Sequence, residues 1–155
     1  MKLRNAFKIA GLATSILFSS LSFASSVNLG ENDVAIHGYD PVAYFVKSMP
    51  VEGSAMYTAT HDGAIYRFSS EKNRDMFKAS PEKYAPQYGG YCAYAVANNS
   101  YARIDPTVFT VLDDKLYLNY NARVQKRWNK KQSKFIDQAD QYWPELLEKQ
   151  KALSK

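Results

Sequence analysis

Two pairs of short runs, in which apolar and polar residues alternate, constrain the fold most strongly. Residues 55–61 and 64–70 alternate on either side of Asp62-Gly63, a pair typical of the two-residue turn of a β-hairpin. Residues 108–112 and 115–120 alternate in the same way across Asp113-Asp114. The sequence therefore predicts two small hairpins.

Helix signals stand between and after these runs. Asp40-Pro41 has the residue types of a helix N-cap and a first helical position, and Asn121 can cap a long C-terminal helix. Pro144 predicts a break in that helix, with a last helix over residues 145–151. The predicted class is α+β, with two β-hairpins, short helices and a C-terminal helical cover. The residues show no internal repeat.

The first 24 residues have the pattern of a secretory signal peptide: a basic start, an apolar stretch and small residues before a cleavage site after Ala24. We expect an exposed lead-in over residues 25–35, one domain with its C-terminal helices over 36–147 and a polar tail over 148–155. Because the only Cys is Cys92, a lipid anchor after the leader is excluded. The mature protein is expected to be periplasmic or secreted, without stable membrane insertion.

Charge and composition disfavour two further classes of protein, nucleic-acid binders and intrinsically disordered chains. Residues 25–155 hold seventeen Lys and Arg against fifteen Asp and Glu, a balance that does not favour nucleic-acid binding. Hydrophobic residues make up 46% of the chain, which also has 12 Tyr, and such a composition predicts an ordered domain.

Residues 84–97 are unusual, with four Tyr, a Gly pair and the single Cys. The run 91–97 is too short for periodicity to distinguish a helix start from a buried strand, and we favour the helix. Tyr88, Tyr91 and Tyr94 could line a groove for a small ligand, because tyrosine combines apolar area with a hydroxyl. The alternative is that these rings pack between the first hairpin and the C-terminal helices.

A run of basic residues occupies the predicted C-terminal helices. The pattern predicts a helix face exposed to solvent, and the alternative is a basic surface on which a partner docks. Its members are Arg123, Lys126, Arg127, Lys130, Lys131 and Lys134.

Several strings, taken in this order, resemble the YHS domain family, and in particular its exported single-domain members. The resemblance extends from about Val34 to Leu147. The strings that carry it are Asp40-Pro41-Val42, His61 to Ser70, Asn73 to Phe77, Ser80 to Tyr84, Pro86 to Ala93 and Leu116 to Asn121.

The resemblance implies the fold of that family and the binding of metal ions, with copper and other heavy metals the usual suggestion. In thiol-rich members, Cys follows the Asp-Pro-Val string, and two more Cys stand where the second strand enters the next helix. This chain has Ala43, Ser69 and Asn73 at those places. The resemblance therefore implies the fold more strongly than thiolate chemistry.

The candidate metal ligands are His37, His61 and Cys92, which come from three distant segments. Together they could form a three-coordinate Cu(I) site, and with Asp40 or Asp62 a site for a divalent metal. Copper is the first expectation, and zinc or iron the next. Cys92 could instead be a reactive thiol with His61 as its base, or a small buried hydrophobe.

The favoured function is an exported, non-catalytic binding module for a transition metal. The first alternative is a small-molecule or protein-interaction module without a metal, whose protein partner the residues do not identify. A thiol-dependent redox enzyme is the least favoured class.

Overall fold

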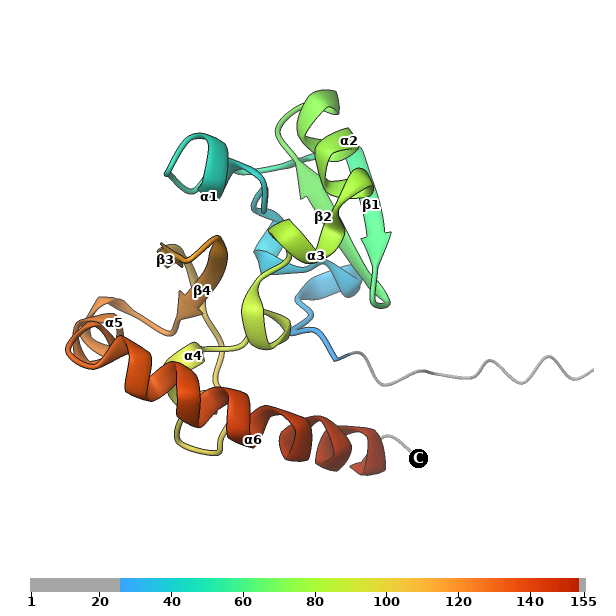
Figure 1. Ribbon diagram of the computed structural model, residues 1–155. Helices are drawn as coiled ribbons and strands as arrows, with labels where there is room; N and C mark the ends of the chain where they lie inside the picture. The colour runs from blue at the N-terminus through green and yellow to red at the C-terminus, as the bar shows by residue number, and fades with distance from the viewer. Residues whose placement is uncertain (1–25, 154–155) are drawn as a thin grey trace, which may run out of the picture.

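The computed structural model describes residues 26–153, so the expected leader and its cleavage site lie outside the described residues. Figure 1 shows β1, β2 and α2 at one end of the molecule and α6 along the other. The first part of the chain contains η1 (Glu31–Asp33), η2 (Ile36–Gly38), α1 (Ala43–Val46), β1 (Ser54–His61), β2 (Ala64–Phe68), α2 (Glu71–Ala79) and α3 (Pro81–Tyr84). The second part contains η3 (Gln87–Gly90), α4 (Ala93–Val96), β3 (Asp105–Leu112), β4 (Lys115–Asn119), α5 (Ala122–Asn129) and α6 (Gln132–Leu153).

Both predicted hairpins and the α+β class are confirmed. Strand β1 pairs with β2 and β3 pairs with β4, each antiparallel in a separate two-stranded sheet. Residues 93–96 form the short helix α4, as favoured over a buried strand. Helix α6 is continuous through Pro144, so the predicted break and separate last helix are wrong.

Packing and ion pairs explain why α6 continues to Leu153 and includes most of the expected tail. Leu146 is buried two residues after Pro144, in a cluster that includes Trp128. Beyond it, Lys149 pairs with Glu145 at 2.8 Å, one helical turn earlier. Proline costs one backbone hydrogen bond, which the buried apolar face offsets.

The order of elements occurs twice along the chain. A 3-10 turn, a one-turn helix, a hairpin and a longer helix occupy residues 36–79 and again residues 87–129, which we call the first and the second repeat. Strands β1 and β3 each have eight residues, and β2 and β4 each have five. The sequence shows no internal repeat, because the two repeats share the order of their elements rather than the identity of their residues.

Backbone details agree between the two repeats. Each begins with three residues of positive φ, 36–38 in the first and 88–90 in the second. The hairpin turns, Asp62-Gly63 and Asp113-Asp114, have positive φ at both positions, which matches the twist of a two-residue hairpin.

Caps and bulges agree as well. The side chain of Ser70 accepts the N–H of Asn73 at the start of α2, and that of Asn121 accepts the N–H of Val124 at the start of α5. The first strand of each hairpin also has a shift in pairing register near its beginning. Two separate stretches of sequence therefore specify the same local structure.

The segment before the first repeat is part of the core, so the predicted exposed lead-in is wrong in its apolar residues. Val27, Val34 and Ala35 are buried, and Val34 bridges to Ile65 of β2. Residues 31–33 between them are exposed. The segment folds back on β2 because its apolar side chains complete the core above the hairpin.

No helix among residues 26–153 is long and apolar enough to cross a bilayer.

Candidate ligand-binding cavity

The structure does not bring the three predicted metal ligands together. His37 lies on η2 at an open cavity, His61 ends β1 at a second cavity, and Cys92 is buried directly before α4. Among residues 26–153, no three His, Cys, Asp or Glu side chains form a group that could hold a metal ion. The site predicted from His37, His61 and Cys92 is therefore not assembled, because their segments pack on different parts of the core.

Cys92 has the environment of a buried hydrophobe. Its side chain is 1% exposed, and its Sγ donates to Asn119 Oδ1 at 3.5 Å. Burial raises the pKa of the thiol, although backbone N–H groups oppose the shift. In the part of the chain that the structure describes, no hydrogen bond joins Cys92 to His61, which contacts Asp62 and Phe77 instead. The thiol and the predicted base do not form a pair.

Asp40 takes the corresponding place in the first repeat. Its carboxylate is fully buried and accepts the N–H groups of Val42 and Ala43 at 2.9 and 3.3 Å. Its other oxygen accepts the N–H and the hydroxyl of Ser69 at 2.8 and 2.7 Å, and the side chain of Asn73 at 2.7 Å. Five donors satisfy one buried charge, and they join α1, the end of β2 and α2.

These donors include the positions that stand in place of the thiols of thiol-rich YHS domains. Ala43, Ser69 and Asn73 lie together around Asp40. They present a methyl group, a hydroxyl and an amide, and no thiolate. This corner is a hydrogen-bonded support for the fold, with its acceptor atoms occupied by the chain itself.

The three tyrosines of the predicted groove pack against the C-terminal helices. The Tyr88 hydroxyl donates to Asp140 Oδ1 at 2.7 Å. The Tyr91 ring lies 4.7 Å from Tyr101, and the Tyr94 ring meets the edge of Phe135 at 5.1 Å. Each ring therefore has a partner in the second repeat or α6.

Tyr88 also lines a cavity of about 410 Å³ with His61, Glu82 and Trp143. Within it, His61 Nε2 lies 3.5 Å from Asp62 Oδ2, and the His61 ring meets the edge of Phe77 at 5.9 Å. His61 and Tyr88, predicted for different sites, thus share one hollow between the first hairpin and α6.

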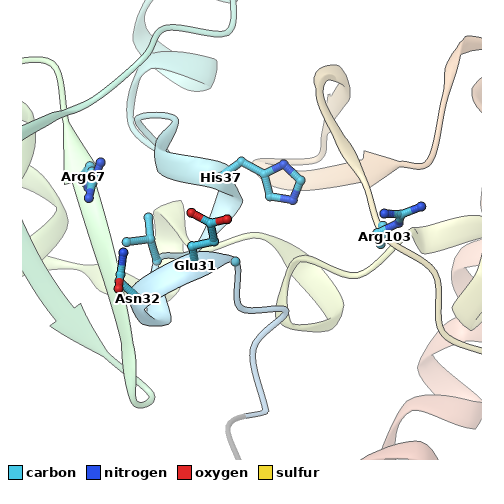
Figure 2. Close-up of a pocket in the computed structure, with 7 residues that line it drawn as sticks. Glu31, Asn32, His37, Arg67 and Arg103 are labelled. Atoms are coloured by element: carbon cyan, nitrogen blue, oxygen red, sulfur yellow. The ribbon is translucent and has the colours of Figure 1, made fainter.

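A cavity of about 680 Å³ opens beside η2, within the usual volume of small-molecule sites. Figure 2 shows Arg67 and Arg103 on opposite sides of this cavity, with Glu31 and His37 between them. We call it the basic cavity. Its lining residues are Gly30, Glu31, Asn32, Val34, His37, Arg67 and Arg103.

The loop that carries His37 is held in an uncommon conformation. Ile36 and His37 both have φ of 51°, a region that β-branched residues such as Ile rarely adopt. The loop is fixed at both ends, because Ala35 N–H donates to Ile65 at 2.9 Å and Gly53 N–H donates to Gly38 at 2.8 Å. Such strain persists only where the surroundings hold it, and it is frequent at functional sites.

The charges of the basic cavity are unbalanced. Arg67 is half-buried on β2 and Arg103 is exposed before β3. Neither forms an ion pair with an acid within the described part of the chain. Glu31 is the one acid in the lining. An anionic group entering the cavity would find two guanidinium groups with free donors.

The sequence pointed to His37 but not to the two arginines. Arg67 alternates with the buried Tyr66 and Phe68, so its position predicts only an outward-facing strand residue. Arg103 lies outside any predicted element. No local signal could place both arginines on one cavity. Their common position at the cavity depends on how the loop of His37 packs between β2 and the segment before β3.

The sequence model of the YHS domain matches residues 42–88, which include α1, the first hairpin, α2 and α3. No curated protein and no solved structure shows a significant match to the chain. The match ends at Tyr88, so it covers most of the first repeat and leaves the second repeat beyond Tyr88 outside. The match identifies residues 42–88 of the chain as a YHS domain.

Proposed function

We propose that the protein is an exported, non-catalytic binding module that holds a small anionic molecule in the basic cavity. The observation that carries the proposal is the pair of arginines, Arg67 and Arg103, which face one cavity without an acidic partner among residues 26–153. Guanidinium groups bind carboxylates and phosphates through paired N–H donors, so both are suitable ligand groups.

The state of Cys92 supports a binding role without catalysis, and the first residues of the sequence support export. The one thiol is buried, and its raised pKa disfavours the thiolate that a nucleophile requires. Export is supported by the signal-peptide pattern of residues 1–24, with its basic start and its small residues Ser22 and Ala24 before the expected cleavage site.

Metal binding is the second candidate, because the YHS domain is often linked to metal ions. His61 lies within the matched residues and is the nitrogen ligand that they offer. Copper, and then zinc or iron, are the metals to test. The titrations described next distinguish metal binding from anion binding.

Calorimetric titration of the envelope form with inorganic phosphate and with citrate tests the proposal. We expect Arg67→Gln and Arg103→Gln each to weaken binding of the better probe by about tenfold, or about 1.4 kcal/mol. Lys78→Gln is the control, since it removes one positive charge from α2, outside the cavity and the C-terminal helices, and should bind like the parent. Equal weakening by all three variants, or no weakening by the cavity variants, would contradict the proposal.

Elemental analysis of the same preparation, followed by titration of the stripped protein with Cu(I), Cu(II), Zn(II) and Fe(II), tests the metal. If a metal binds more tightly than competing chelators and His61→Ala removes that binding, while neither phosphate nor citrate binds, then the metal-binding function replaces the anion-binding one.

A further inference from the structure

A row of basic side chains follows one face of α5. Arg123, Lys126, Arg127 and Lys130 are spaced at i, i+3, i+4 and i+7, which places them on the same side of a helix. All four are exposed, whereas Trp128 on the opposite side is fully buried. Lys131 and Lys134 continue the row into α6. We call these six residues the basic face.

The basic face results from a strong separation of charge along the chain. Residues 115–136 contain seven Lys and Arg and no Asp or Glu. The remainder of residues 25–155 contains ten Lys and Arg against fifteen Asp and Glu. A body with one cationic side and an otherwise acidic surface turns that side toward an anionic partner.

The two repeats differ at this helix. In α2 of the first repeat, Arg74 lies 2.9 Å from both Glu71 and Asp75. In α5, the corresponding helix, none of the cations of the basic face forms an ion pair with an acid of the described residues. The shared plan of the repeats therefore does not account for the positive charge of α5.

The shape and composition of the basic face favour a lipid surface over a protein partner. Four of its six members are Lys, whose compact charges need no fixed partner geometry. Tyr120, directly before α5, is 44% exposed, and tyrosine is enriched at the level of lipid headgroups. Figure 1 shows α5 at the edge of the molecule, on the side away from β1. The helix can therefore approach a flat surface while β1, β2 and α2 lie on the far side of the molecule (Figure 1).

We propose that the basic face docks the protein peripherally on a membrane that contains anionic phospholipids. The attraction is electrostatic, with Tyr120 at headgroup level, and no helix of residues 26–153 crosses the bilayer. This surface is distinct from the basic cavity, whose arginines belong to β2 and to the segment before β3. The docking and the anion-binding function can therefore fail separately.

Sedimentation with vesicles tests the proposal, using the envelope form of the full protein. It should bind vesicles of phosphatidylglycerol and phosphatidylcholine in 0.1 M salt, bind poorly to phosphatidylcholine alone, and dissociate in 0.5 M salt. The variant Lys126→Gln/Arg127→Gln/Lys130→Gln should lose roughly a hundredfold in partition coefficient, because each cation near an anionic surface contributes about fivefold.

A matched control removes three exposed cations of α2 and of the C-terminal end of α6 (Figure 1), as Lys72→Gln/Lys78→Gln/Lys149→Gln. It should lose less than about fivefold, since these residues lie away from the docking side. Circular dichroism and a urea transition should show that both variants keep the fold. Equal losses in the two variants, or equal binding of the parent to neutral vesicles, would overturn the proposal.

Sedimentation velocity separates the lipid from a second copy of the chain as the occupant. If the parent forms a salt-sensitive oligomer that the α5 variant abolishes, and vesicle binding is the same for both, the basic face is a self-association surface and the membrane proposal is wrong. A monomeric parent that binds anionic vesicles supports it.

Discussion

The first and second repeats place different chemistry on one backbone plan. Asp40 and Cys92 both precede a one-turn helix, and backbone N–H groups two and three positions further along interact with both side chains. Both also accept the N–H of the residue after the second hairpin strand, Ser69 in one repeat and Tyr120 in the other. The Tyr94 N–H near Cys92 also donates to Asn119 Oδ1 at 3.3 Å. One nest of donors holds a carboxylate, and the other holds a neutral thiol.

The two repeats differ in how many of their buried polar groups form hydrogen bonds within the fold. The carboxylate of Asp40 has five donors, whereas Asn119 beside Cys92 has a buried Nδ2 without an acceptor among the described residues. The first repeat therefore uses its polar interior fully. The second repeat has a less saturated interior and carries its charge outside, on α5.

The largest expected effect is at Asp40. Asp40→Ala leaves five buried donors without their acceptor, so we expect the free energy of unfolding to fall by at least about 4 kcal/mol. Urea unfolding measures the change. Asp137→Ala, at an exposed position of α6, is the control and should change stability by less than about 0.5 kcal/mol. A small effect at Asp40 would contradict the conclusion that its five hydrogen bonds stabilise the fold more than the contacts of Cys92 do.

The next effect concerns the tyrosine hydroxyls that join the repeats to their surroundings. Tyr44 donates to the Pro106 carbonyl at 2.8 Å, and Tyr88 donates to Asp140. Burial raises the pKa of both phenols above the value near 10 of an unfolded chain. The native state therefore holds these protons more tightly, and their contribution is complete below about pH 10 and is lost as pH rises further.

Urea transitions between pH 8 and 11.5 measure this dependence. We expect the free energy of unfolding to fall above about pH 10 by about 1.4 kcal/mol per pH unit for each such tyrosine. Tyr88→Phe should be about 1 kcal/mol less stable at neutral pH and show a shallower alkaline slope. An unchanged slope in this variant would mean that the native structure does not raise the pKa of Tyr88.

The smallest effect is expected at Cys92. Cys92→Ser keeps a donor for Asn119 Oδ1 and an acceptor for the three backbone N–H groups, so it should cost about 1 kcal/mol or less. The parent thiol should react slowly with a thiol-modifying reagent at pH 7 and faster on unfolding, because it is buried and its pKa is raised. Rapid modification of the folded protein would show instead an accessible, activated thiol.

Local signals in the sequence were sufficient for the hairpins and most helices. Asp62-Gly63 predicts its turn because a two-residue hairpin needs positive φ, and Asn121 predicts a helix start because its side chain replaces a missing backbone acceptor. At Pro144 the local signal failed, since burial of Leu146 outweighed the lost hydrogen bond.

The sequence by itself determined the α+β class, both hairpins and the similarity to the YHS domain, because these depend on residues close together along the chain. Only the tertiary structure revealed the two repeats, which share φ angles and burial but few residues. It also decided the sites, separating His37, His61 and Cys92 and placing Arg67 and Arg103 on one cavity. Such convergence depends on how distant segments pack on a common core, and no local pattern records that packing.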